Sequence, residues 1–158
     1  MSIERVREYF RQYQMEDRIQ EFDVSSATVE LAAKAVGCEP ARITKTLSFK
    51  VGDKAVLIAT AGDAKIDNAK YKAQFHTKAT MLKPEEVTEL IGHAVGGVCP
   101  FAVNPGTEVY LDVSMRRFDL VYPAAGSSNS AIGLSMEELE KYSGSLGWID
   151  VCKGWQPA

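Results

Sequence analysis

A lysine on the apolar face of a predicted strand is the first residue in this chain whose position suggests chemistry. The stretch ITKTLSFKV, residues 43–51, alternates as a β-strand does, and successive side chains of a strand point to opposite faces. Lys45 therefore shares a face with Leu47 and Phe49, whereas Lys50 lies on the polar face. Such a lysine either extends to solvent at a sheet edge or places its ammonium at the mouth of an apolar pocket, where it meets an anion such as a phosphate.

A loop rich in glycine and proline is the second candidate. The segment GGVCPF spans residues 96–101, and an Asn-Pro-Gly turn follows it at 104–106. Paired glycines followed by a proline can turn sharply and expose backbone N–H groups, because glycine adopts unusual backbone angles and proline then fixes the chain. Those N–H groups can bind a carbonyl or an oxyanion without any reactive side chain. The alternative is an ordinary surface loop.

A small, polar loop is the third candidate. The segment AAGSSNSAIG covers residues 124–133. Its glycine, serines and asparagine can donate hydrogen bonds to a ligand at little steric cost, but most loops of this composition are only turns. It lacks the lysine and the spacing of a P-loop, and no GxGxxG pattern occurs in the chain.

Other reactive groups form weaker patterns. Cys99 and His93 are six residues apart and can be imagined as a nucleophile with its base, but sequence neighbours are rarely a spatial dyad, and a cysteine beside a proline is commonly buried. Asp63, Asp67 and His76 do not have the spacing of a recognisable metal site. The sequence predicts neither a metal nor a cofactor.

The overall composition limits the classes of protein. The chain has 158 residues, 46% of them hydrophobic, and a net charge of −3, which suits a single domain over 1–158. It has no apolar run long enough for a membrane span and no signal-peptide core. The cysteines are three in number and form no CxxC pair, so we expect reduced thiols. We therefore expect a soluble cytoplasmic protein with no membrane partner.

A local excess of lysine lies between Lys65 and Lys83. This stretch contains five lysines and a single acid, Asp67. The negative net charge argues against a protein that coats nucleic acid over its whole surface, but it allows a local basic patch. The stretch is either an ordinary solvated face or a contact to nucleic-acid phosphates.

The elements that must position these candidates can be predicted from periodicity and capping. Apolar residues at helical spacing indicate helices near residues 3–13 and 29–36, and a Gly-Asp turn at 52–53 joins the strand at 43–51 to a fully apolar strand at 55–60. Later patterns indicate helices in the lysine-rich stretch, at 83–93 and at 135–144, and strands at 108–113, 118–124, 130–134 and 147–151. This mixed order predicts one α+β domain on a mixed, mostly antiparallel sheet.

Together, the stretches ITKTLSFK, AVLIATAGD and GGVCPF, with the glycine-serine loop before IGLSMEELEKYSG, resemble the YbaK/ProX family of aminoacyl-tRNA deacylases. That family includes the editing domain inserted in many bacterial prolyl-tRNA synthetases. The similarity runs from the second helix to the last strand. It implies a barrel-like YbaK-type fold surrounded by helices, and hydrolysis of the ester that joins a wrong amino acid to tRNA. Such editing is needed because a synthetase pocket rejects small or isosteric amino acids by only about 1–3 kcal/mol.

The resemblance also implies roles for individual residues. Lys45 would hold the 3′-terminal nucleotide, and the loop with Gly97 and Pro100 would wrap the aminoacyl carbonyl; these three are the predicted catalytic residues. The attacking group would be water or a group of the substrate, with no metal and no protein nucleophile. The predicted substrate-binding residues are Thr46, Gly96, Val98, Phe101, Gly126, Ser127 and Asn129.

The amino acid removed is less well defined by the resemblance. Alanine-removing members often place a histidine in the loop that corresponds to Gly126–Ser130, where this chain has glycine, serines and Asn129. The pair Lys45 and Thr46 resembles the cysteine-removing branch. Cysteinyl-tRNA(Pro) is therefore the first expected substrate and alanyl-tRNA(Pro) the second, with prolyl-tRNA synthetase as a candidate partner. The alternative is a non-catalytic module that binds tRNA ends or acyl nucleotides.

Overall fold

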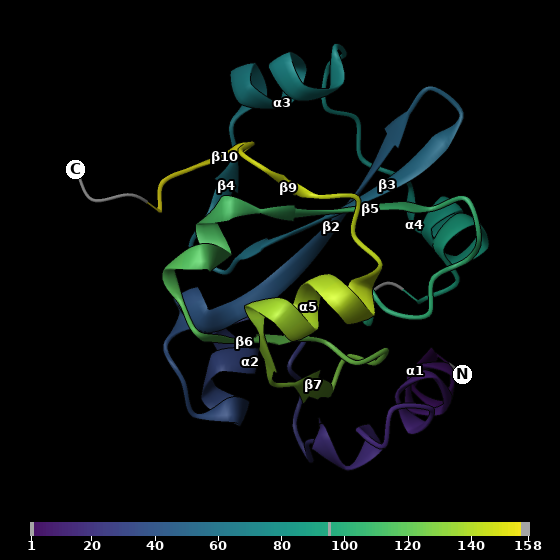
Figure 1. Ribbon diagram of the computed structural model, residues 1–158, viewed down its shortest axis with the longest axis vertical. Helices are drawn as coiled ribbons and strands as arrows, with labels where there is room; N and C mark the ends of the chain where they lie inside the picture. Colours follow the sequence, from purple (N-terminus) through teal and green to yellow (C-terminus); the bar gives the residue numbers. More distant parts are fainter. Residues whose placement is uncertain (1, 95, 156–158) are drawn as a thin grey trace.

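A curled, mixed sheet forms the centre of the computed structural model, which describes residues 2–94 and 96–155 (Figure 1). Its strand order is β8-β6-β2-β3-β5-β9. The strands are β2 (Ile43–Val51), β3 (Lys54–Ala61), β5 (Glu108–Asp112), β6 (Leu120–Pro123), β8 (Leu134–Ser135) and β9 (Trp148–Ile149). Two smaller pairs join β1 (Ile19–Glu21) to β7 (Ser130–Ile132), and β4 (Lys65–Ile66) to β10 (Cys152–Lys153).

The pairings confirm the predicted fold class. The pairs β2–β3, β6–β8, β1–β7 and β4–β10 are antiparallel, whereas β2–β6, β3–β5 and β5–β9 are parallel. The six-stranded sheet is thus mixed, with two antiparallel and three parallel pairs, and antiparallel pairs are in the majority among the described residues only when the two smaller strand pairs are included. Since β3 lies between β2 and β5 and is buried from Ala55 to Ala61, it is the central strand that its apolar sequence predicted.

Helices surround the sheet and begin where the sequence offers caps (Figure 1). Thr28 accepts a hydrogen bond from the backbone of α2, Asp67 does the same for α3, and Ser135 forms a capping box with Glu138 on α5. The helices are α1 (Ser2–Arg11), α2 (Val29–Val36), α3 (Asn68–Phe75), α4 (Pro84–Glu86) and α5 (Met136–Ser143), with short turns η1 (Glu16–Arg18), η2 (Pro40–Arg42), η3 (Val87–Ile91) and η4 (Val113–Arg117). None of the helices among the described residues has the length and apolar character needed to cross a membrane.

The outer edge of β2 is interrupted, and this interruption positions the site. On one side β2 pairs with β3 over its whole length. On the other side it pairs with β6 only at Ile43 and Thr44. Backbone pairing resumes at Ser48, whose carbonyl accepts a hydrogen bond of 3.1 Å from the Leu82 N–H. Between these points, at Thr46, the outer edge of β2 pairs with no other described segment.

Two predicted elements differ from the structure. The strand predicted at 130–134 divides at Gly133 into β7 and β8, which pair with different strands; a Cβ at Gly133 would lie only 2.9 Å from the Tyr122 ring. The helix predicted at 83–93 is the short α4 followed by the π-helical turn η3. The strands β1, β4 and β10 have two or three residues each, and such lengths carry no periodic signal.

Candidate functional site

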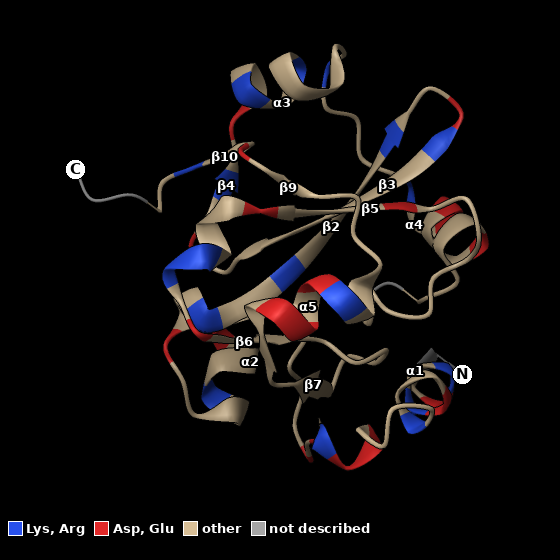
Figure 2. Ribbon diagram, viewed as in Figure 1, with Lys and Arg blue, Asp and Glu red and all other residues tan. Residues whose placement is uncertain are grey.

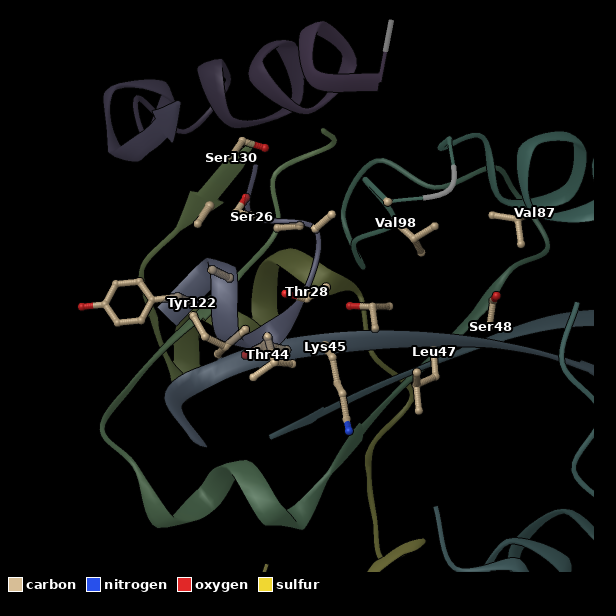
Figure 3. A pocket seen from close by; sticks show the side chains of 18 of the residues that line it. Ser26, Thr28, Thr44, Lys45, Leu47, Ser48, Val87, Val98, Tyr122 and Ser130 are labelled. Atoms are coloured by element: carbon tan, nitrogen blue, oxygen red, sulfur yellow. The ribbon is translucent and has the colours of Figure 1, made fainter. Parts of the chain in front are cut away.

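A cavity of about 430 Å³ lies along the interrupted edge of β2 (Figure 3). Its walls come from the segment before α2, from β2, from the segments on either side of α4, from the 96–98 loop and from the β6–β7 region. Lys45 is the one charged residue among the described residues that line it. The lining residues are Ser26, Ala27, Thr28, Val29, Ala32, Ile43, Thr44, Lys45, Thr46, Leu47, Ser48, Met81, Leu82, Pro84, Val87, Gly96, Val98, Tyr122, Ala124, Ser130 and Ala131.

Lys45 borders this cavity, but its ammonium points away from the cavity's centre. In Figure 3 the side chains of Lys45 and Leu47 leave β2 on one side, whereas Ser48 and Val98 lie on the other. The alternation therefore places Lys45 and Leu47 on one face, as the sequence predicted. The other labelled lining side chains lie mainly on the Ser48 side, so residues from both faces of β2 line the cavity, with Lys45 and Leu47 at its border.

The surroundings of Lys45 disfavour the charged form of its ammonium group. Partial burial lowers the pKa of the ammonium, and the nearby charge of Lys65 lowers that pKa further. No described residue forms a hydrogen bond or an ion pair with it, although Cys152, Asp63 and Glu30 act on it electrostatically and oppose this lowering of the pKa. A half-buried ammonium without a direct partner gains the most from an incoming anion.

Thr46 faces the cavity side of the strand with unused polar groups. Its hydroxyl oxygen is buried and has no hydrogen-bond partner among the described residues. Its backbone lies where the outer edge of β2 is unpaired. A buried hydroxyl without a partner costs free energy, so a ligand that bonds to it would remove that cost.

The two loops predicted separately from the sequence are in contact. A Cβ added at Gly97 would lie 2.7 Å from the carbonyl oxygen of Gly126 and 2.9 Å from the Cα of Ser127. Gly96 has φ of +93° and would place a Cβ 3.5 Å from that of Ser128. Backbone therefore meets backbone here, which explains why the position of Gly97 requires glycine.

The polar side chains of the 126–130 loop form hydrogen bonds within the loop and to a neighbouring segment. The hydroxyl of Ser127 is 2.7 Å from that of Ser130 and 2.9 Å from Oδ1 of Asn129. The Asn129 side-chain amide donates to the carbonyl of Phe22, and the Phe22 N–H donates back to the Asn129 carbonyl at 2.8 Å. These contacts join the loop to the segment before α2, and Ser130 is the member of the loop that lines the cavity.

The remaining predicted residues lie behind the cavity wall. Pro100 is buried, and Phe101 is fully buried with its ring centroid 5.0 Å from that of Phe10 in an edge-to-face arrangement. Of the predicted residues, Lys45, Thr46, Gly96 and Val98 line the cavity. Those that do not are Gly97, Pro100, Phe101, Gly126, Ser127 and Asn129.

Cys99 and His93 touch, contrary to the expectation for close sequence neighbours, but they do not form a nucleophile and base. The thiol sulfur lies 3.6 Å from His93 Nε2, and both residues are fully buried. The same Nε2 is 2.7 Å from the Phe101 carbonyl, which accepts hydrogen bonds only, so Nε2 carries the proton. Burial raises the pKa of Cys99 to about 12 and lowers that of His93. The thiol thus stays protonated and enclosed.

Several lining residues were missed by the sequence analysis. Ser26 and Thr28 lie before α2, where serine and threonine serve as capping residues and give no separate ligand signal; the Ser26 N–H donates to the Ser128 carbonyl at 2.7 Å. Met81, Leu82 and Val87 form the apolar wall, and nothing in their local pattern distinguishes a cavity wall from a core. Among the described residues there is no cluster of His, Cys, Asp and Glu that could hold a metal ion.

Comparisons with known proteins find chains that are similar to this one. A protein of Bacillus subtilis (strain 168), YwhH, itself uncharacterized, is 54% identical over 157 residues, covering 99% of this chain and 100% of that protein. Proline--tRNA ligase of Bacillus pumilus (strain SAFR-032) is 32% identical over 93 residues, which are 56% of this chain and only 16% of the ligase.

A solved structure and a family model extend these similarities. The structure is described as a candidate trans-editing enzyme for prolyl-tRNA synthetase; it superposes with a TM-score of 0.87 at 29% identity, over 97% of this chain and 98% of its own. The model of the aminoacyl-tRNA editing domain matches residues 23–142, which include β2 and both glycine loops. The chain therefore belongs to the aminoacyl-tRNA editing domain family, the YbaK/ProX-type deacylases.

Proposed function

We propose that this deacylase acts in trans on mischarged tRNA, with cysteinyl-tRNA(Pro) as its first substrate and alanyl-tRNA(Pro) as its second. The observation that carries the proposal is the half-buried ammonium of Lys45, which has no direct partner among the described residues and lies beside an otherwise uncharged cavity. An aminoacyl-tRNA end has the matching chemistry, since it joins a small amino acid to a nucleotide that carries a phosphate. We infer a cytoplasmic location, a single editing domain over 1–158, and prolyl-tRNA synthetase as a candidate partner.

In this proposal the cavity receives the amino acid. Its apolar wall, including Val87 and Val98, suits a small side chain. The free hydroxyl and the unpaired strand edge at Thr46 offer hydrogen bonds to the amino and carbonyl groups of the substrate. The pair Lys45 and Thr46 favours cysteine over alanine by its resemblance to the cysteine-removing branch.

The hydrolysis itself rests on positioning in this proposal. The ester carbonyl lies against the backbone of Gly96 and Val98, which line the cavity, and N–H groups fixed in such a loop stabilise negative charge on the oxygen. The Gly97 N–H is bonded to the Ala94 carbonyl at 3.0 Å, so Gly97 contributes by fixing the loop. Pro100 and Phe101 do not contact the substrate; because both are buried, they fix the position of the loop. Gly126, Ser127 and Asn129 act by supporting Gly97. Water, or a hydroxyl of the substrate, attacks the ester without a protein nucleophile.

A panel of mischarged tRNAs tests the proposal. The protein is incubated with cysteinyl-, alanyl- and seryl-tRNA(Pro), and with other mischarged tRNAs, and the remaining ester is measured over time. Release of cysteine that is faster than release of alanine or serine supports the proposal. Faster release of another amino acid contradicts the assigned substrate. Rates equal to those in buffer, with tRNA still bound, would leave the non-catalytic binding module as the function.

A further inference from the structure

A group of cations lies on the side of β2 that faces away from the cavity. Lys65 on β4 and Lys153 on β10 are directly paired across the two strands, and both are exposed. Lys45 points to this same side, and the charge of Lys65 acts on it. Figure 2 shows the basic positions of β4, β10 and η4 gathered on one side of the molecule. We call Lys45, Lys65 and Lys153 the basic face.

Three of the acids near this face are already engaged, and a fourth, Glu30 on α2, acts on Lys45 electrostatically. Asp63 forms an ion pair with Arg117 at 2.6 Å, and Asp150 forms one with Lys70 at 3.0 Å. Asp67 caps the first turn of α3 through the N–H groups of Ala69 and Lys70. None of the three lysines of the basic face has an ion pair with a residue that the structure describes.

The pairing of Lys65 with Lys153 is unfavourable without an anion. Like charges directly opposite each other on antiparallel strands destabilise the pair, and β4 and β10 pair through only two residues each. The chain therefore keeps a repulsive contact next to a third lysine that is half-buried and lacks a direct partner. A polyanion with regularly spaced charges relieves all three at once.

We propose that the basic face binds the phosphate backbone of the tRNA acceptor end, while the aminoacyl group enters the cavity on the opposite side of β2. The unpaired edge at Thr46 is where the ligand would pass from one side to the other. This inference rests on the proposed function, since Lys45 connects the two sides. It also divides the lysine-rich stretch 65–83: Lys65 contacts RNA, Lys70 is used in the fold, and Lys72 and Lys78 remain solvated.

Charge reversal at matched positions tests the basic face. Binding of deacylated tRNA(Pro) is measured between about 50 and 200 mM salt for the wild type, for Lys65→Glu with Lys153→Glu, and for Lys72→Glu with Lys78→Glu. Both double variants change the net charge equally. The first pair should weaken binding at least about tenfold and reduce the slope of log K against log salt by about 2, since each phosphate contact contributes about 1. The second pair should change both quantities much less.

A single variant separates binding from folding. Lys65→Glu replaces the repulsive cross-strand pair by an attractive one, so it should raise the Tm by about 1–3 °C while it weakens tRNA binding. A merely structural lysine would not produce opposite changes in the two measurements. A Tm and an affinity that fall together, equal losses in the two double variants, or a wild type that binds no tRNA would each overturn the basic face.

The binding assay is independent of hydrolysis, so the two proposals can fail separately. Suppose that the mischarged tRNA panel shows no hydrolysis, but the Lys65→Glu, Lys153→Glu double variant binds tRNA more weakly than the wild type. The basic face is then supported and the deacylase assignment fails. If hydrolysis occurs, the ratio of kcat/KM for cysteinyl-tRNA(Pro) to that for 3′-cysteinyl-adenosine, which lacks the phosphates, should fall at least about tenfold in the double variant. An unchanged ratio overturns the basic face alone.

Discussion

The two sides of β2 present different chemistry to a ligand. On the Ser48 side the strand borders a cavity of about 430 Å³, and the described residues that line it are apolar or uncharged apart from Lys45. On the Lys45 side the nearest strand pair carries two exposed lysines in direct register. One side thus suits a small, weakly polar group and the other a chain of phosphates. A single strand can serve both purposes because its side chains alternate and one stretch of its edge is unpaired.

The largest expected effect comes from the residue that connects the two sides. Lys45→Ala should lower kcat/KM for deacylation at least about a hundredfold, because a charged hydrogen bond is worth about 1.5–3 kcal/mol and mispositioning of the ester adds to the loss. The free energy of unfolding should not fall, since the ammonium has no partner to leave unpaired. Rates for mischarged tRNA and urea unfolding curves measure both quantities.

Lys50→Ala is the matched control for this change. Lys50 lies on the same strand and pairs with Glu86 at 3.6 Å, with half of its side chain exposed. An exposed pair of this kind contributes at most about 1 kcal/mol, so activity should stay close to that of the wild type. Equal losses of kcat/KM in Lys45→Ala and Lys50→Ala would show that Lys45 has no special role, and would contradict the contrast between the two sides of β2.

A smaller effect is expected from the loop that closes the cavity. Gly97→Ala forces a Cβ against the Gly126 carbonyl oxygen at 2.7 Å, and such overpacking costs roughly 1–3 kcal/mol. The two loops must then separate. Because a small displacement near an ester is costly, kcat should fall at least about tenfold, whereas tRNA binding at the basic face should change little. Steady-state rates and tRNA affinity distinguish these outcomes.

Gly106→Ala provides the comparison for stability. Gly106 has φ of +91° and no atom within 4 Å of an added Cβ, so alanine there is strained by about 1–2 kcal/mol without touching the cavity. It should lose stability but keep its activity per folded molecule. If Gly97→Ala and Gly106→Ala lose activity only in proportion to stability, the 96–98 loop has no positioning role.

The smallest effect on activity is expected at Cys99, which is fully buried and is not among the residues that line the cavity. Cys99→Ala should keep activity within about twofold and lower stability by about 1 kcal/mol, the cost of one small buried group. Full activity after treatment of the native protein with an alkylating reagent is expected for the same reason. An inactive Cys99→Ala together with an active Lys45→Ala would instead indicate a thiol nucleophile.

The pH dependence of stability supplies a second measurement on Cys99. Its pKa is raised from 9.0 to about 12 in the folded protein, so between these values the folded state keeps a proton that the unfolded chain releases. Stability from this group is therefore complete below about pH 9 and falls as pH rises, by up to about 1.4 kcal/mol per pH unit. Cys99→Ala should show a correspondingly shallower decline in unfolding experiments from pH 8 to 11.

Much of the fold could be predicted because it depends on short-range pattern. The alternation of residues 43–51, the cap at Thr28 and the capping box at Ser135 each involve residues only a few positions apart. The pair of β4 and β10 could not be predicted, since two-residue strands form only where the chain brings Ile66 and Cys152 together. The division of a predicted strand at Gly133 likewise reflects close packing against Tyr122.

For the candidate site, the sequence by itself determined which residues are available: a lysine among apolar neighbours, two glycine loops, and the motif order of the editing family. Only the tertiary structure decided how they are used. It brings Gly97 against Gly126, engages Asn129 with Phe22, and directs Lys45 toward Lys65. The physical reason is that contacts between distant segments, and the side of a sheet on which a cavity opens, depend on packing and pairing across the whole chain, which local residue patterns do not encode.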